Sequence, residues 1–392
     1  MSSRRAQAST RGTSRASGSV AGAAVAGPAQ VQAQAQVRDR LDNVNKIAVL
    51  VPHSVGDFVF TLPALHALRL AYPQAELALV GQPWQCALLH GRPGPVDKVV
   101  LMPPYPGVGL AADDPCGDSA AAAFLEQTQA ARIDLAVQLF GGGRYSNPFV
   151  QRFGARLAVG HRADDAPPLD RWVRYAVPNN RRLALLEVAA LAGAPPPPLG
   201  DEFAVTEADR AEAAKVFRVC AGRPLAVLQP GSTDPRRCWP AESFAAVGTA
   251  LAKAGAAVAV NGTASEAAVV RAVIDAMPWP AIDLTGRLSL AGLCGLLDGA
   301  ALMVSNDTGP LHLALAIGTP SVGIFWFTNL IDGTPLRQHL LRSALSLRLH
   351  CPVCGAENVR FRCPHDPSFV SDVPVEQVTE LAVSLLRSVT KQ

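Results

Sequence analysis

Residues 47–81 read IAVLVPHSVGDFVFTLPALHALRLAYPQAELALVG, and this stretch decides the fold. It opens on IAVLV (residues 47–51), a continuous β-branched and aliphatic run that is typical of a buried parallel strand. After a glycine-containing turn, apolar residues recur at helical spacing up to Pro73, which predicts a helix. LALV (residues 77–80) then predicts a second strand. A strand, a helix and a strand in this order predict a parallel sheet covered by helices.

The same alternation continues through the rest of the chain. Strands are predicted at residues 99–102, 133–139, 225–229, 256–260, 281–284, 301–305 and 321–325, and helices near Val247, Val270, Leu296 and Leu315. The run PPPPLG (residues 195–200) separates two similar halves, because consecutive prolines form a stiff spacer. We therefore predict an α/β fold with two doubly wound parallel-sheet, Rossmann-like domains that face each other across a cleft.

The predicted domain boundaries follow from these patterns. They are an N-terminal tail (1–45), an N-terminal domain (46–198), a C-terminal domain (199–372) and a final helix (373–392), which is expected to pack back on the N-terminal domain. The tail consists mainly of Ala, Ser, Gln and Arg, which bury too little apolar surface to offset the entropy of ordering. A disordered tail is the preferred interpretation, and a cleaved targeting peptide is the alternative.

The composition excludes several classes of protein. With 49% hydrophobic and 17% charged residues, the chain can bury a large core and is not a disordered protein. A net charge of +3 and 6% aromatic residues argue against a nucleic-acid partner. No uninterrupted apolar run reaches the roughly 20 residues of a membrane-spanning helix. The dispersed cysteines favour a reduced, cytosolic protein.

Functional residues are expected in the loops that follow strands, because ligands bind at the carboxyl ends of strands in such sheets. In the first loop, Gly56 permits a tight turn, and Asp57 stands at the start of a helix. Asp57 either caps that helix or faces the cleft as a general base. Taken alone, the loop favours the cap.

The second loop is PGSTDPRRCWP (residues 230–240). The hydroxyls of Ser232 and Thr233 could bind phosphate oxygens, and Arg236 or Arg237 could offset the charge of a leaving diphosphate. The alternative is a solvated turn with surface arginines. A large aromatic residue within the turn argues for an anchored loop instead.

Two further loops follow later strands. In NGTASE (residues 261–266), Glu266 could accept both hydroxyls of a ribose or simply start a helix. In SNDTGPLH (residues 305–312), the N–H groups of Thr308 and Gly309 begin a helix, and a helix N-terminus is an anion site. His312 lies in the first turn of that helix. A lone histidine there is more often a core residue than a ligand-binding one.

Several motifs are missing where their chemistry would need them. The sequence has no GxGxxG, Walker lysine loop, HExxH or GxSxG in the required context. This argues against a dinucleotide oxidoreductase, a P-loop enzyme, a zinc protease and a serine hydrolase.

Taken together and in this order, the loops resemble glycosyltransferase family 9, the ADP-heptose:lipopolysaccharide heptosyltransferases. Residues 47–81 are similar to the start of that family, and SNDTGPLHLALAIGTPSVGIF (305–325) is similar to its Asp-Thr-Gly-x-x-His signature. The resemblance implies a GT-B fold. It also implies an inverting, metal-independent and cofactor-free transfer of a heptose or related sugar from an ADP-sugar to a lipopolysaccharide or other surface-glycan acceptor.

The resemblance also implies residue roles. Asp57 would be the general base, and Arg237 would stand near the donor phosphates. Glu266 would bind the donor ribose, and Asp307 would lie at the diphosphate and sugar site. The implied donor-binding set further includes Ser232, Thr233, Leu288, Thr308, Gly309 and His312, and the acceptor side includes Gly56 and Arg144. The N-terminal domain would thus bind the acceptor and the C-terminal domain the nucleotide sugar.

Two departures from the family pattern stand out. The strand at 321–325 is followed by Trp-Phe-Thr, where the family usually has Gly-Pro-Thr. The segment 102–118 is net acidic and lacks the arginines that would bind an anionic acceptor. Arg144 is therefore the candidate for an acceptor-binding arginine in the N-terminal domain. The acceptor is therefore not necessarily the usual inner-core lipid.

A cysteine cluster lies near the C-terminus. Cys351-x-x-Cys354 is followed by Cys363-x-His365, and these are zinc-type ligands. Free thiols are the first interpretation, a structural metal the second and a disulfide the third.

The expected partners follow from the family. They are an ADP-heptose-like donor and a glycan or glycolipid acceptor, with no nucleic acid, and the protein is expected to be a cytoplasmic monomer that contacts the inner membrane peripherally. The alternatives are a GT-B enzyme with another nucleotide sugar or a protein acceptor, and a non-catalytic sugar-nucleotide-binding protein. The general base and the phosphate-site cation argue against the latter, because a binder needs no base.

Overall fold

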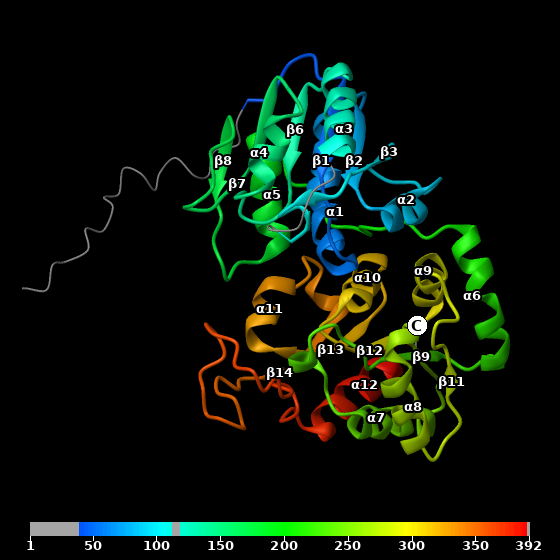
Figure 1. Cartoon of the computed structure of the whole chain (residues 1–392). Coiled ribbons are helices and arrows are strands. Elements are labelled where there is room, and N and C mark those ends of the chain that lie inside the picture. Colours follow the sequence, from blue (N-terminus) through cyan, green and yellow to red (C-terminus); the bar gives the residue numbers. More distant parts are fainter. Residues whose placement is uncertain (1–38, 112–117, 390–392) are drawn as a thin grey trace, which may run out of the picture. The chain divides into compact units, whose positions relative to one another are not determined.

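The computed structural model describes residues 39–111 and 118–389 (Figure 1). In the N-terminal domain, six parallel strands lie in the order β3-β2-β1-β6-β7-β8. Their bounds are β1 (Lys46–Leu50), β2 (Glu76–Gly81), β3 (Lys98–Leu101), β6 (Leu135–Gln138), β7 (Leu157–Arg162) and β8 (Arg171–Arg174). A short pair, β4 (Tyr105–Pro106) and β5 (Gly109–Leu110), follows β3 in the chain. The helices are α1 (Val55–Ala71), α2 (Pro83–Leu89), α3 (Asp118–Ala130), α4 (Ser146–Gln151) and α5 (Arg181–Leu191).

The C-terminal domain contains a second six-stranded parallel sheet, in the order β11-β10-β9-β12-β13-β14. Its strands are β9 (Leu225–Gln229), β10 (Ala257–Val260), β11 (Ile282–Asp283), β12 (Leu302–Asn306), β13 (Ser321–Trp326) and β14 (Leu341–Ser346). The α-helices are α6 (Glu207–Cys220), α7 (Ala241–Lys253), α8 (Ala267–Ala276), α9 (Leu290–Gly299), α10 (Gly309–Ile317), α11 (Phe327–Gly333) and α12 (Val375–Val389). Three single 3₁₀ turns, η2 (Pro235–Arg237), η3 (Ala264–Glu266) and η4 (Gln338–Leu340), complete the domain.

The two sheets share one topology. In each sheet the first strand pairs with the second on one side and with the fourth on the other, so the strand order reverses beside β1 and beside β9. Ligands bind outside the carboxyl ends of strands at such a reversal. The prediction of two doubly wound parallel-sheet domains is therefore confirmed. After the exposed Lys46 at its start, the central strand β1 is apolar and buried, because β2 and β6 flank it and helices cover both of its faces.

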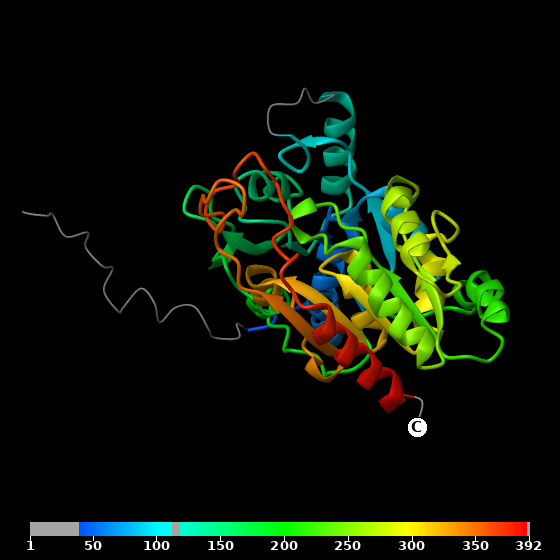
Figure 2. The same cartoon turned by 90° about the horizontal axis from the view of Figure 1, so that it is seen from below.

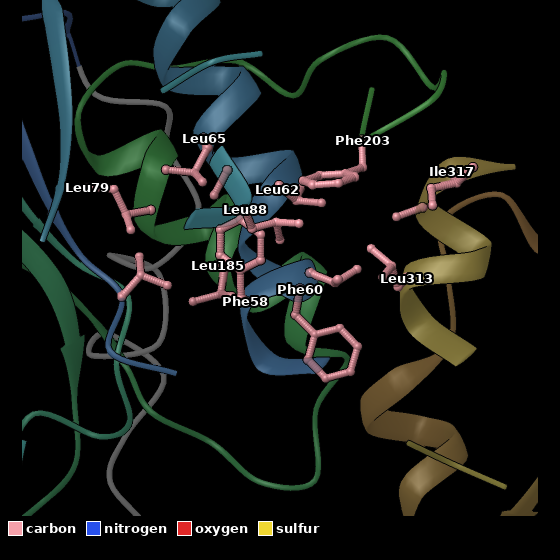
Figure 3. Packing of buried hydrophobic residues seen from close by; sticks show 14 of the residues in the cluster. Phe58, Phe60, Leu62, Leu65, Leu79, Leu88, Leu185, Phe203, Leu313 and Ile317 are labelled. Carbon is pink, nitrogen blue, oxygen red and sulfur yellow. The ribbon is translucent and has the colours of Figure 1, made fainter. Parts of the chain in front are cut away.

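The two domains meet through helices α1 and α10. Most of α1 is buried, since it packs against α5 of its own domain and α10 of the other. Figure 3 shows Phe60 and Leu62 of α1 on the side that faces Leu313 and Ile317 of α10, with Phe203 beside them. One apolar cluster thus runs from the N-terminal sheet into the C-terminal domain, which holds the first turns of α1 and α10 close together.

Two boundary predictions need correction. Leu41 and Val44 pack against the core, and the Leu41 N–H donates to the Tyr72 hydroxyl over 3.1 Å. The described residues 39–45 are therefore not a tail, because two apolar side chains among them reach the core. Residues 1–38 of the predicted tail lie outside the described residues.

The final helix α12 also lies elsewhere than predicted. It packs against α7 and against strands β12, β13 and β14, all in the C-terminal domain (Figure 2). The expectation that it packs back on the N-terminal domain is wrong. Its apolar face joins the buried cluster that includes Val322 and Ala344, and this cluster lies on the C-terminal sheet. The buried residues of that face are Val378, Ala382, Leu385 and Leu386.

Candidate active site

A pocket of about 510 Å³ lies between the two domains. The first turn of α1 lines it from the N-terminal domain, and the loops after β9, β10 and β12 line it from the C-terminal domain. The loop before α1 follows β1, and two of the other loops follow β9 and β12, so they lie at the order reversals of the two sheets, where a doubly wound sheet binds its ligands. The loops predicted from the sequence therefore converge on one cavity.

Asp57 lies in the first turn of α1 and lines this pocket. The N-cap of α1 is Ser54, whose hydroxyl donates to Asp57 Oδ2 over 3.0 Å. Asp57 is therefore not the cap residue that the simplest interpretation of the loop proposed. Its side chain keeps one-third of its surface exposed, so the carboxylate remains accessible from the cavity.

Arg181 is the most informative residue that the sequence interpretation missed. It begins α5 and its Nη1 donates to Asp57 Oδ1 over 2.7 Å. Arg181 lines the pocket and stays 42% exposed, so it can also contact a bound anion. His53 lies 3.8 Å from the other oxygen of Asp57, but burial lowers the pKa of His53. Arg181 is thus the cation beside Asp57 at neutral pH.

The two arginines of the loop after β9 differ in their contacts and in their position relative to the pocket. Arg236 forms an ion pair with Asp234 over 2.7 Å and does not line the pocket. Arg237 lines the pocket and donates from Nη1 to Asp307 Oδ2 over 3.1 Å. Arg237, which the family resemblance placed near the donor phosphates, is therefore the arginine of this loop that faces the cavity.

Two buried side chains fix the position of this loop. Trp239 is only 1% exposed, and its indole N–H donates to the carbonyl of Val373 over 3.0 Å. Asn306, at the end of β12, accepts from the Trp239 N–H and donates to the carbonyl of Pro230. Asn306 thus ties both ends of the loop to the strand that precedes Asp307.

Asp307 connects Arg237 to His312. Its Oδ1 lies 3.0 Å from Nε2 of His312, and both side chains are 5% exposed. Burial lowers the pKa of His312 more than the nearby carboxylate raises it, so the ring is neutral near pH 7. We assign the proton to Nε2, because Nε2 faces a carboxylate that can only accept. His312 therefore orients Asp307, and it also lines the pocket, so its contact with the donor stays a prediction.

The start of α10 approaches the start of α1 closely. A Cβ atom at Gly309 would lie 3.1 Å from Cβ of Val55 and 3.2 Å from the backbone nitrogen of Gly56. Thr308 is the N-cap of α10, and its side chain makes no capping hydrogen bond. The N-terminal backbone N–H of this helix therefore meets the pocket without a capping side chain, as an anion site requires.

Glu266 caps a helical turn and also lines the pocket, while its binding of a ribose stays a prediction. Its Oε2 accepts from the Thr263 N–H over 2.8 Å in a capping box, and the residue also lines the pocket. A Cβ atom at position 231 would overlap the Glu266 carboxylate, so Gly231 provides the space that this side chain occupies. Ser232, Thr233 and Leu288 line the same cavity.

Arg144 is not among the residues that line the pocket. Its guanidinium lies 3.5 Å from Asp165, and its side chain is 63% exposed.

From α11, Asn329 and Asp332 line the cavity, and burial raises the pKa of Asp332. Trp326 turns away from the pocket and packs against Phe369, with ring centroids 4.8 Å apart. Asn329 and Asp332 belong to no motif that could have identified them from the sequence.

Comparison with known proteins provides a family context for this geometry. A model of glycosyltransferase family 9 (heptosyltransferase) matches residues 152–353. The chain is 24% identical over 324 residues to lipopolysaccharide heptosyltransferase 2 of Salmonella typhimurium, covering 76% of this chain and 87% of the relative. It is also 24% identical over 298 residues to lipooligosaccharide heptosyltransferase 2 of Haemophilus ducreyi, covering 70% of this chain and 81% of the relative.

Solved structures share the fold. A family 9 glycosyltransferase from Veillonella parvula superposes with a TM-score of 0.69 at 19% identity, covering 90% of this chain and all of the other. Escherichia coli ADP-heptose lipopolysaccharide heptosyltransferase II gives a TM-score of 0.68 at 19% identity, covering 88% and 99%. The fold is therefore GT-B, as the sequence resemblance implied. Among the described residues, no helix has the length and apolar character of a membrane span.

Proposed function

Because the chain belongs to glycosyltransferase family 9, we propose that it transfers a heptose or related sugar from an ADP-sugar to a hydroxyl of a lipopolysaccharide or other surface-glycan acceptor. We further propose that the transfer inverts the anomeric centre and needs no metal ion. One observation carries this proposal. A carboxylate from the N-terminal domain, Asp57, lines the same pocket as an arginine and a helix N-terminus from the C-terminal domain.

The proposed reaction is a single displacement. The acceptor oxygen bonds to the anomeric carbon while the bond from that carbon to the diphosphate oxygen breaks, and the electron pair leaves with the diphosphate. The acceptor proton passes to Asp57. A carboxylate is a weak base for an alcohol, but it suffices when proton transfer is late and positive charge has grown on the sugar ring.

The leaving diphosphate needs positive charge. Arg237 supplies a cation, and the N–H groups of Thr308 and Gly309 at the start of α10 supply the positive end of a helix dipole. Asp307 and His312 hold Arg237 in place through the hydrogen bonds described above. This arrangement supports a metal-independent mechanism, since the protein itself provides the electrophilic groups.

The remaining pocket residues divide between donor and acceptor. Glu266 would accept the ribose hydroxyls, and Leu288 would pack against the nucleoside. Arg181 replaces Arg144 as the arginine on the N-terminal side that would bind an anionic acceptor. It lines the pocket beside Asp57, whereas Arg144 does not.

The decisive test compares the wild-type chain with Asp57→Ala. A thermal-shift panel of ADP-, UDP- and GDP-sugars identifies the donor, because a ligand of the folded state raises the melting temperature. Turnover is then followed by nucleotide diphosphate release with a truncated lipopolysaccharide acceptor. We expect Asp57→Ala to lose at least about 10²-fold in rate and to keep the donor-induced thermal shift.

Glu76→Ala is the matched control, since that exposed carboxylate pairs only with Lys98 in the described structure and lies outside the pocket. A variant at Asp57 that turns over as fast as wild type would show that the base is another group. Retention of the anomeric configuration in the product would exclude a single displacement. A rate in metal-free buffer well below the rate with Mg²⁺ would exclude metal independence.

A further inference from the structure

Residues 347–374 form a long connection between β14 and α12, the orange-red loop beside β14 in Figure 1. Throughout this fully described segment the only regular pairing is an isolated bridge between His350 and Glu357. Yet Cys351, Phe369 and Val370 are at most 2% exposed. Loops of this length without secondary structure are uncommon, so another interaction must order this one.

Four soft ligand groups converge within the loop. Cys351, Cys354 and Cys363 each offer a sulfur and His365 offers a ring nitrogen, and these atoms all lie within 4.8 Å of one another. Two thiolates of a tetrahedral zinc site lie ~3.7 Å apart, given Zn–S bonds of ~2.3 Å. None of the three cysteines is in a disulfide. The donors are thus already near coordination distance.

The backbone around the first two cysteines is shaped for this role. The Val353 N–H donates to Cys351 Sγ over 3.4 Å, which holds this sulfur in position. Gly355 follows Cys354 with φ of 72°, a left-handed conformation that glycine adopts without strain. Its N–H donates to the Cys351 carbonyl over 2.9 Å and closes the turn.

The second half of the site is also held in place. The Cys363 N–H donates to Oδ1 of Asn358 over 3.2 Å, and Asn358 is itself 3% exposed. Asn358 is in turn bound to the loop, because its N–H donates to the Leu349 carbonyl. Both halves of the ligand set therefore have backbone support that does not depend on the ligand atoms themselves.

We propose that Cys351, Cys354, Cys363 and His365 bind one thiolate-preferring divalent cation of the zinc class in a closed structural site. Four protein ligands leave no position for substrate, which is the property of a structural rather than a catalytic site. None of the four residues lines the pocket between the domains. The site is therefore compatible with sugar transfer that uses no metal.

The cysteine-containing loop (residues 347–374) contacts the loop after β9 (residues 230–240), which carries Arg236 and Arg237. The Phe369 N–H donates to the Arg236 carbonyl over 2.8 Å, and the Arg236 guanidinium lies over the ring of Trp326. Phe369 packs on that same ring. Because Arg237 follows directly, ordering of the cysteine loop would help to place the phosphate-site cation. This second part rests on the proposed function of Arg237.

The first experiment measures the metal alone. Full-length protein purified without a histidine tag is analysed by mass spectrometry for zinc and iron, with thiols titrated before and after chelation. We expect about one metal ion per chain, and three additional reactive thiols once it is removed. His365→Cys should retain the metal, since it keeps a ligand, and His365→Ala should bind it much more weakly.

Cys86→Ser is the matched control, because Cys86 is free, exposed and outside the cluster. Metal-free protein that does not take up added Zn²⁺, or a disulfide among these cysteines in freshly purified protein, would overturn the site. Equal metal content in His365→Ala and wild type would remove His365 from the ligand set. These outcomes do not depend on catalysis, so they remain separate from any failure of the proposed function.

The second experiment tests the coupling to the donor loop. ADP affinity is measured by calorimetry for wild type, His365→Cys and His365→Ala. We expect His365→Ala to bind ADP several-fold more weakly and His365→Cys to bind it as wild type does. If chelated wild-type protein stays folded and binds ADP as well as the loaded protein, the coupling is refuted while the metal site stands.

Discussion

Arg181 donates from Nη1 to Asp57 Oδ1 over 2.7 Å, and so joins the start of α5 to the first turn of α1. Both side chains also line the pocket between the domains. The pair is partly exposed, so its own contribution to stability is small. Its consequence is local, because it fixes the direction in which the carboxylate points and places a cation where an acceptor would enter.

Replacement of Arg181 by alanine should weaken binding of the acceptor more than binding of the donor. We expect the acceptor KM to rise roughly tenfold, because a charge-assisted contact is lost, and the affinity for ADP to stay unchanged. Steady-state kinetics with each substrate varied in turn separate the two effects. Arg174→Ala is the control, since Arg174 is an exposed arginine of the same domain that pairs with Asp164. A purely donor-side effect would contradict this assignment.

Arg237 and Asp307 should behave as one unit. Arg237→Ala is expected to lower the rate on the order of 10²-fold, because it removes the cation at the leaving diphosphate. Asp307→Asn should lower the rate less, through loss of the 3.1 Å contact that holds Arg237. The double variant should lose less than the product of the single effects. Strictly multiplicative losses in single-turnover assays would show that the two residues act independently.

Gly309→Ala should disturb the approach of the two domains. The new methyl would lie 3.1 Å from Val55 Cβ and 3.2 Å from the Gly56 nitrogen, so these atoms of α1 must move by a few tenths of an ångström. We expect activity to fall roughly fivefold or more, in line with the cost of overpacking. Gly200→Ala is the control, because a Cβ there meets no atom within 4 Å. Wild-type activity in Gly309→Ala would mean that this spacing is not required.

Stability should decrease in mild acid because of buried histidines. Burial lowers the pKa of His161 from 6.5 to about 4, so between these values the unfolded chain binds a proton that the folded chain does not. The folded state therefore loses stability as pH falls from about 6.5 towards 4, by up to about 3 kcal/mol for this residue. Burial also lowers the pKa of His312, which acts in the same direction.

Denaturant melts between pH 7 and pH 4.5 test this prediction. His161→Gln should flatten the dependence of the unfolding free energy on pH, whereas His90→Gln, at an exposed position, should leave it unchanged. An equal slope in wild type and His161→Gln would show that other groups control acid unfolding.

Much of the fold could be predicted because it depends on local patterns. Strands β1, β9, β10 and β13 were predicted within a residue of their ends, since buried parallel strands are short continuous apolar runs between glycine or proline. Strands β7, β8 and β14 were missed. β8 is an edge strand with an arginine at each end and only two apolar residues between them, and β14 is interrupted by Arg342 and Ser343, so neither shows the central-strand pattern.

The sequence by itself determined four of the loops that line the pocket, because each follows a strand and contains the small, hydroxyl or charged residues that are typical of phosphate-binding loops. Only the tertiary structure decided that Arg181 rather than Arg144 lies beside Asp57 and that His312 forms a hydrogen bond with Asp307. The contact between Arg181 and Asp57 joins residues that are distant in the chain. A local pattern specifies which groups are present, whereas the packing of one domain against another specifies which of them meet.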